Sequence, residues 1–194
     1  TQDAGYPQAG CRQPCCQPAR NDIALRRRVA SLAIVDPLSN QRWLIDCTPD
    51  FPKQLLSLDR LAQRDAPGPL DGVLLTHAHI GHYLGLVHLG REAMAARDVP
   101  VYAMPEMQRF VQRNGPWQQL VVLQNITCHA LADGQPVPLN DRIEVTPLLV
   151  PHRGEYSETV GFRVQGPSRS VLYLPDIDAW DLWQTRIEDV LAEV

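Results

Sequence analysis

The chain has 194 residues, of which 44% are hydrophobic and 21% charged, and its formal net charge is −4. These values are typical of a globular domain with a sizeable core, and the mixed charges form no basic surface for nucleic acid. No apolar run reaches the roughly 18 residues that a membrane-spanning helix needs. We therefore predict a single domain over residues 1–194 with neither nucleic acid nor a membrane as partner. The absence of a secretory signal leaves two locations open, the cytoplasm and export after signal cleavage.

Residues 1–22 are rich in Pro, Gly, Gln and Cys and predict an irregular, cysteine-rich loop. After it, short apolar runs alternate with amphipathic stretches. In chain order these predict strands at 31–35 and 42–46, a helix at 51–62, a strand at 72–76, a helix at 83–96, a strand at 101–104, a helix at 105–113, strands at 120–123, 142–150, 160–164 and 170–174, and a helix at 181–194. This order predicts a layered α/β domain.

Three histidines, His77, His79 and His82, follow directly on the predicted strand 72–76. A loop at the carboxyl end of a strand is where open α/β sheets bind their ligands. Neutral imidazole is the commonest metal ligand, and three imidazoles so close in sequence can converge on one cation. We therefore interpret this loop as part of a metal site rather than as a histidine-rich surface turn.

Residues 77–82 (His-Ala-His-Ile-Gly-His) resemble the His-x-His-x-Asp-His motif of the metallo-β-lactamase superfamily. Within that superfamily the chain is similar to the coenzyme PQQ synthesis protein B (PqqB) group. Residues 2–8, the cysteine cluster, residues 151–157 and residues 174–178 match that group in the same order along the chain. The resemblance implies an αββα sandwich that carries a metal site.

The same resemblance implies the ligands of that site. His77, His79 and His152 would form a three-histidine position, while His82 and Asp176 would belong to a second one, with Asp176 placed to bridge. Asp176 and His152 would also be the catalytic residues. The implied cofactor is zinc, as one or two ions, although three histidines and a carboxylate also suit iron or manganese.

Two features depart from the superfamily pattern. Gly81 stands where the motif has Asp, and no histidine follows His152 to supply a further ligand near the C-terminus. We therefore expect one tightly bound ion and a weak second one, unless water or a neighbouring side chain fills the gap. The last predicted helix resembles the element before a C-terminal strand, so we also expect an initial strand and a C-terminal segment of the fold to be missing from this chain.

Cys11, Cys15 and Cys16 can present three thiolates to one zinc ion, whose structural sites take four sulfur or nitrogen ligands. The resemblance to the PqqB group implies a cysteine-rich zinc loop at this place, and reduced thiols without a metal are the alternative. Cys47 and Cys128 are predicted to be ordinary core or strand residues.

Asp46, His88 and His129 are further side chains of types that could belong to a metal site. Asp46 ends the predicted strand 42–46, where the resemblance implies a carboxylate that supports the histidine loop. A solvated strand end is the alternative. His88 and His129 lack a partner at ligand spacing and are predicted to lie outside the site.

Three functions remain open. The first is a metal-dependent hydrolase that acts on a small-molecule ester, lactone or phosphodiester. The second, implied by the resemblance to the PqqB group, is an iron-dependent oxygenase in PQQ biosynthesis. The third is a metal-binding or carrier protein without catalysis, which Gly81 favours.

Overall fold

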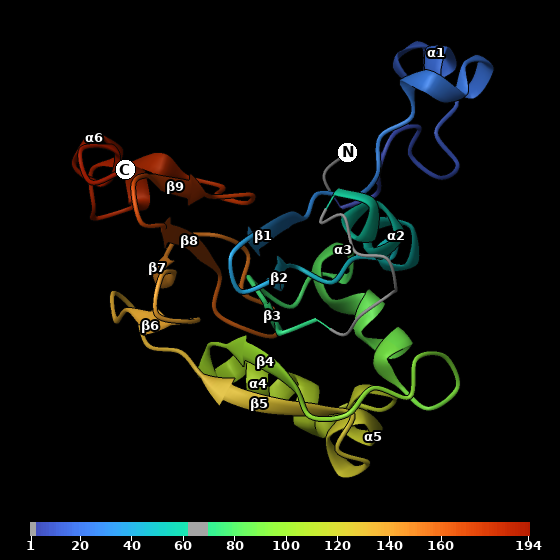
Figure 1. The fold of residues 1–194 in the computed structure, drawn as a ribbon. Helices are drawn as coiled ribbons and strands as arrows, with labels where there is room; N and C mark the ends of the chain where they lie inside the picture. The colour runs from blue at the N-terminus through green and yellow to red at the C-terminus, as the bar shows by residue number, and fades with distance from the viewer. Residues whose placement is uncertain (1–2, 62–69) are drawn as a thin grey trace.

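The computed structural model describes residues 3–61 and 70–194 and contains two β-sheets packed on each other (Figure 1). The first sheet has five strands in the order β1 (Leu32–Asp36), β2 (Gln41–Ile45), β3 (Gly72–Leu74), β4 (Val99–Ala103) and β5 (Ile126–Ala130). β1 runs antiparallel to β2, whereas β2 to β5 are parallel to one another. The carboxyl ends of these parallel strands therefore meet at one edge.

The second sheet is antiparallel throughout. Its four strands are β6 (Val137–Pro138), β7 (Glu144–Leu149), β8 (Val160–Gln165) and β9 (Ser170–Tyr173), in that order. A buried cluster that includes Trp43 and Leu74 of the first sheet and Val145 and Phe162 of the second fills the space between the sheets. Burial of apolar side chains from both faces holds the two sheets together.

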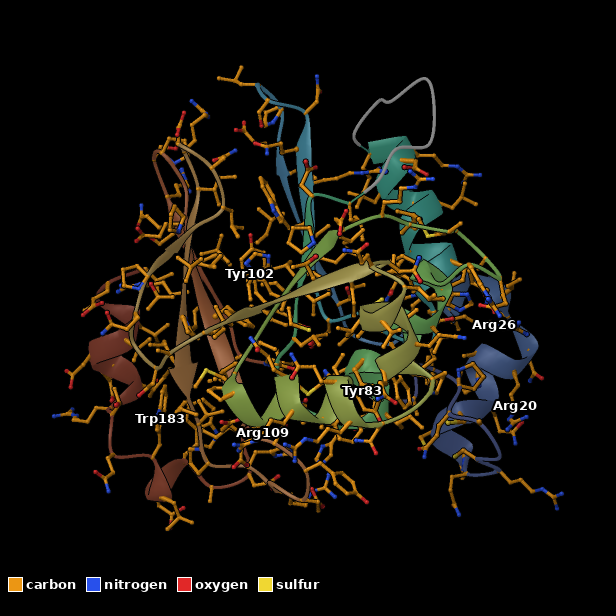
Figure 2. All side chains as sticks on the ribbon, turned by 90° about the horizontal axis from the view of Figure 1, so that it is seen from below. Arg20, Arg26, Tyr83, Tyr102, Arg109 and Trp183 are labelled. Carbon is orange, nitrogen blue, oxygen red and sulfur yellow. The ribbon has the colours of Figure 1, made fainter. Side chains whose placement is uncertain are left out.

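Some of the helices cover the other face of the first sheet. The described residues form the helices α1 (Gln17–Asn21), α2 (Phe51–Leu61), α3 (Ile80–Tyr83), α4 (Pro105–Arg113), α5 (Trp117–Val122) and α6 (Ile187–Leu191), and the 3-10 turns η1 (Pro14–Cys16), η2 (Ile23–Leu25), η3 (Leu84–Leu89) and η4 (Trp180–Leu182). A second buried cluster joins α2, η3, α4 and α5 to this sheet. Figure 2 shows Tyr83 beside α4, where its ring lies 5.0 Å from that of Phe110.

The outer face of the second sheet carries the C-terminal segment. Arg163 of β8 forms an ion pair with Glu193 just after α6, and the Trp183 indole N–H donates to the Leu149 carbonyl at 2.8 Å. The layer order is therefore helix, sheet, sheet, helix, as the predicted αββα sandwich requires.

Gly85 in η3 allows a close approach between the segment after the histidine loop and the residues that follow β2. A Cβ atom at this position would lie 2.2 Å from the Thr48 carbonyl oxygen and 2.8 Å from Cβ of Phe51. The Gly85 N–H donates to the Cys47 carbonyl at 2.9 Å. Only glycine can keep this contact, because such a separation lies well inside van der Waals distance.

The predicted strand at 120–123 is wrong, because these residues form the end of α5 and its cap. Leu120 is buried, whereas Val122 is 71% exposed. A strand in the middle of a sheet would bury this apolar run on both faces, but here only one side of the run is buried. The strand lies instead at β5, which pairs in parallel with β4 and which the sequence analysis did not predict.

Two predicted helices are shorter or broken. The helix predicted at 83–96 begins earlier, as α3, and ends at Leu89, because Gly90 is extended. The helix predicted at 181–194 divides into η4 and α6, since Trp183 is extended where its indole binds the Leu149 carbonyl. The predicted loop 1–22 contains η1 and α1. Residues 1–2 of that loop and residue 62 of the helix predicted at 51–62 lie outside the described residues.

Candidate metal centre

The candidate ligands all follow strands at one edge of the sandwich. His77, His79 and His82 lie in the loop and short helix after β3, His152 follows β7, and Asp176 follows β9. Ligand sites in open α/β sheets lie beyond the carboxyl ends of parallel strands, and β3 is such a strand. The fold therefore brings together side chains that are far apart in sequence.

The three predicted first-position histidines converge. Nε2 of His77 lies 2.9 Å from Nδ1 of His79, and Nε2 of His152 lies 3.1 Å from the same Nδ1 atom. One ring nitrogen from each residue lies within 4.8 Å of the others. His77 is almost completely buried, so the cluster is closed on its inner side.

The outward-facing ring nitrogen of each histidine meets an oxygen. These oxygens are Thr76 Oγ1 at 3.0 Å from Nδ1 of His77, Glu155 Oε2 at 2.8 Å from Nε2 of His79, and Asp178 Oδ1 at 3.0 Å from Nδ1 of His152. Such partners fix the tautomer and the ring orientation of metal-binding histidines. Each imidazole is thus held with its second nitrogen pointing inward.

This arrangement fits a divalent cation. An ionised carboxylate only accepts hydrogen bonds, so Glu155 holds a ring proton on Nε2 of His79 and leaves Nδ1 as the atom that faces the cluster. Nδ1 of His79 then faces Nε2 of His77 at 2.9 Å and Nε2 of His152 at 3.1 Å, so three ring nitrogens meet at one place. Tetrahedral zinc with bonds of about 2.0–2.1 Å would set its nitrogens about 3.3 Å apart.

His82 and Asp176 form the second predicted position. Oδ2 of Asp176 lies 3.1 Å from Nε2 of His82 and 3.9 Å from Nε2 of His77, so this carboxylate lies between the two positions. Nδ1 of His82 lies 2.7 Å from Oδ2 of Asp46. The Asp46 contact leaves Nε2 of His82 as the ring atom that faces the site.

Asp46 is buried rather than solvated, which excludes the second interpretation of this residue. Its Oδ1 accepts hydrogen bonds from the backbone N–H and the hydroxyl of Thr76, both at 2.9 Å. Its backbone is left-handed, with φ of 66°, a conformation that only a small share of non-glycine residues adopt and in which Asp is enriched. The carboxylate therefore ties the end of β2 to the histidine loop.

The pKa values of two histidines reflect this crowding. Burial, followed by the neighbouring rings of His82 and His79, lowers the pKa of His77 to about 2. Burial alone would also lower the pKa of His82, but the carboxylates of Asp176 and Asp46 outweigh it and raise that pKa to about 10. At neutral pH these shifts keep the His77 ring neutral and the His82 ring protonated.

A cavity of about 560 Å³ opens beside the two positions. Its lining includes His152, Asp176, Arg153, Asp178, Asp3 and Trp180. The cavity is large enough for a small molecule, and the charged lining provides both hydrogen-bond donors and acceptors.

Cys11, Cys15 and Cys16 lie in and before η1, and their sulfur atoms lie within 4.8 Å of one another. All five cysteines of the chain lie among the described residues as free thiols. The N-terminal segment that holds Cys11, Cys15 and Cys16 stands away from the two sheets (Figure 1), and Figure 2 labels Arg20 and Arg26 of the same part of the chain. Arg20 donates to the Cys11 carbonyl at 3.0 Å through Nε and so closes the loop on itself. Cys47 is fully buried and Cys128 partly buried, as predicted.

The two remaining histidines lie elsewhere, as the sequence predicts. His88 stacks on Phe51 with ring centroids 6.1 Å apart, and His129 packs at 5.1 Å from the ring of Tyr102. Sequence reasoning assigned no individual role to Glu155, Thr76 or Asp3. Glu155 and Asp3 belong to the two matched stretches, 151–157 and 2–8, but only the three-dimensional structure shows what each contacts.

The family is identified by its domain model: residues 41–193 match the β-lactamase superfamily domain. This match covers most of the chain and all five residues of the histidine and aspartate clusters. The chain therefore belongs to the β-lactamase superfamily, as the histidine motif implies.

Relatives of known name extend the resemblance. The chain is 30% identical over 190 residues to coenzyme PQQ synthesis protein B of Xanthomonas campestris pv. campestris (strain B100). This similarity covers 88% of this chain and 61% of the relative. It is also 34% identical over 156 residues to an octanoyltransferase of Porphyromonas gingivalis, with 76% of this chain and 28% of the relative covered. The chain thus spans less than two thirds of either relative, and its similarity to the PqqB group is confirmed.

Solved structures show the same fold. Zinc-bound PqqB from Methylobacterium extorquens matches with a TM-score of 0.76 at 21% identity, over 90% of this chain and 62% of that one. A diphosphatase of the PhnP family matches with a TM-score of 0.61 at 24% identity, over 84% and 58% of the two chains. Among the described residues, no helix is both long and apolar enough to cross a membrane.

Proposed function

We propose that this protein is a metal-dependent hydrolase of a small-molecule ester, lactone or phosphodiester. The observation that carries this proposal is the convergence of three inward-facing ring nitrogens, from His77, His79 and His152, beside a cavity. The names of the zinc-bound PqqB and of the PhnP-family diphosphatase support a bound metal and a hydrolytic reaction, respectively.

His77, His79 and His152 would hold the first ion, and His82 with Asp176 would hold the second. Zinc fits the donor set best, although iron and manganese also accept imidazole and carboxylate ligands. A bound divalent ion lowers the pKa of a coordinated water to about 7 and so supplies hydroxide near neutral pH.

The chain's own residues would orient the reactants. Asp176, which lies between the two histidine positions, accepts a hydrogen bond from the attacking water and fixes its direction. The water oxygen would form the new bond to carbon or phosphorus, the ester bond to the leaving oxygen would break, and the proton lost by the water would end on that leaving oxygen. Arg153 lines the same cavity and can donate to an oxygen of the substrate.

Cys11, Cys15 and Cys16 would hold a separate zinc ion with a structural role. Their three sulfurs already lie together in a short turn, and structural zinc sites use thiolates in a tetrahedral arrangement. Because none of the three cysteines lines the cavity, we assign the cluster no part in catalysis.

The experiment that tests the hydrolase is a comparison of rates on a nitrophenyl ester, a lactone and bis(p-nitrophenyl) phosphate after reloading with zinc, manganese or ferrous iron. We expect hydrolysis of at least one substrate class, its loss in His79→Ala and its retention in His129→Ala. The second variant removes a histidine that packs on Tyr102 outside the site. Oxygen consumption by the ferrous protein without hydrolysis would instead support the second function left open by the sequence, an iron-dependent oxygenase. Metal binding with neither reaction would support a carrier.

A further inference from the structure

Gly81 is closely covered by the N-terminal segment. A Cβ atom at this position would lie 2.6 Å from Cα, 2.8 Å from Cβ and 2.8 Å from the carbonyl oxygen of Asp3. Such distances do not occur between real Cβ atoms and backbone, so any side chain at 81 would displace Asp3. Glycine at this motif position is therefore what lets Asp3 lie against the histidine loop.

The Asp3 side chain reaches the second metal position. Its Oδ1 lies 3.3 Å from Nε2 of His82, the ring nitrogen that faces the site, and Oδ2 of Asp176 lies 3.1 Å from the same atom. Ligand atoms about 2.0–2.2 Å from a tetrahedral zinc ion are separated by about 3.3–3.6 Å. Each carboxylate therefore stands at nearly the distance from Nε2 of His82 that two ligands of one zinc ion have. The ligand atoms that lie within 4.8 Å of one another at this position are those of His77, His82 and Asp176, so Asp3 contacts this group through His82.

The backbone around Asp3 is anchored independently of the site. Tyr6 forms an isolated antiparallel bridge with Arg27, in which each N–H donates to the other residue's carbonyl at 2.8 Å. Gly5 has a φ of 67°, and a Cβ there would lie 2.9 Å from the Arg27 carbonyl oxygen. This turn directs residue 3 toward His82, and Asp3 lines the same cavity as Asp176.

The geometry points to Asp3 as a carboxylate ligand of the second metal position, in place of the aspartate that the superfamily motif has at position 81. With Asp3, this position has His82, Asp176 and Asp3 as protein ligands, which is the number usual for a catalytic zinc. Sequence analysis left two outcomes open for the gap at Gly81, and this arrangement favours a neighbouring side chain filling it. The inference rests on the proposed metal site, since it concerns that site's second ion.

The test is metal titration of chelator-treated protein by calorimetry, with elemental analysis of the product and cobalt(II) absorption as a second readout. Two variants are compared with the unmodified protein. Asp3→Asn removes the negative charge of the side chain at constant size, and Gly81→Ala removes no ligand but displaces Asp3. Asp141→Asn, at an exposed turn, is the matched control. Thiolate-to-cobalt absorption identifies the cysteine cluster separately.

We expect the unmodified protein and Asp141→Asn to bind two ions at the histidine site. Asp3→Asn and Gly81→Ala should each keep the first ion and weaken the second by more than about 100-fold, which exceeds the effect usual for residues that only support a ligand. Combining the two changes should weaken it little further, because both act through Asp3. Retention of the first ion shows that the variants fold.

Two results would overturn the inference. One is an unchanged second ion in Asp3→Asn, which would make Asp3 and His82 a simple ion pair. The other is a single ion at the histidine site of the unmodified protein. A protein that binds no ion at its histidines would refute the proposed function itself, so the two failures are distinguishable.

Discussion

The carboxylate of Asp46 lies 2.7 Å from Nδ1 of His82, and both side chains are fully buried. Asp46 follows β2 directly, and His82 lies in the helix after β3, so the contact joins the ends of two neighbouring parallel strands. It determines which nitrogen of His82 faces the second metal position. Asp46 also binds Thr76, whose hydroxyl contacts His77 at the first position.

From this relationship we predict the effect of Asp46→Asn. The amide keeps the size of the side chain but loses the charge that holds the ring proton on Nδ1 of His82. The affinity for the second ion should fall about 10–100-fold, as is usual when an outer partner of a ligand is removed. Calorimetric titration measures this, with Asp141→Asn as the control, and equal affinities in both variants would contradict the orienting role.

Glu155 should act in the same way on the first ion. It contacts Nε2 of His79 at 2.8 Å, and that contact lowers the pKa of the Glu155 carboxyl. We expect Glu155→Ala to weaken the first ion about 10–100-fold. Glu188→Ala, on the exposed face of α6, should bind it as the unmodified protein does. If Glu155→Ala titrates like Glu188→Ala, the carboxylate has no orienting function.

Gly85→Ala tests the contact between the histidine loop and the end of β2. Because the new methyl group would lie 2.2 Å from the Thr48 carbonyl oxygen, the backbone must shift. Such overpacking lowers the free energy of unfolding by about 1–3 kcal/mol. Gly115→Ala, where a Cβ atom meets open space, should change it little. Urea denaturation of both variants checks this, and similar midpoints would show that the loop adjusts freely.

Thiol labelling tests the cysteine cluster. We expect iodoacetamide at pH 8 to modify Cys11 and Cys15 only after a chelator removes the zinc, because coordinated thiolates are protected. Cys47 should stay unmodified in the folded protein, since burial raises its pKa well above the usual thiol value and keeps the thiolate rare. Rapid labelling of Cys11 and Cys15 without chelator would indicate thiols that hold no metal.

Much of the site was predictable because each of its three parts follows a predicted strand and matches the superfamily pattern, although the parts lie far apart in sequence. The segment 76–82 follows an apolar strand, and both His152 and Asp176 follow further strands, so the common edge could be inferred. The contact between Asp3 and His82 could not be predicted, because it joins positions 79 residues apart that only the folded chain brings together. Glu155 was part of a matched stretch, but no pattern in the sequence indicates that its carboxylate contacts the imidazole ring of His79.

The fold was less predictable where short apolar runs occur. Residues 120–123 have the composition of a strand, yet they form the end of α5 and its cap. Leu120 is the buried residue of this helix. In β5, Ile126 is buried while Thr127 and His129 are exposed, so a strand with little apolar character escaped prediction. Tertiary packing overrides such weak local preferences.

The measurement that tests the central claim most directly is the ion content of chelator-treated protein after reloading, determined by elemental analysis for the unmodified chain, His79→Ala and His129→Ala. His79 is the residue whose Nδ1 contacts both other histidines of the first position. We predict that His79→Ala loses one equivalent of zinc relative to the unmodified chain, whereas His129→Ala loses none. Equal ion content in all three proteins would contradict a metal centre at His77, His79 and His152.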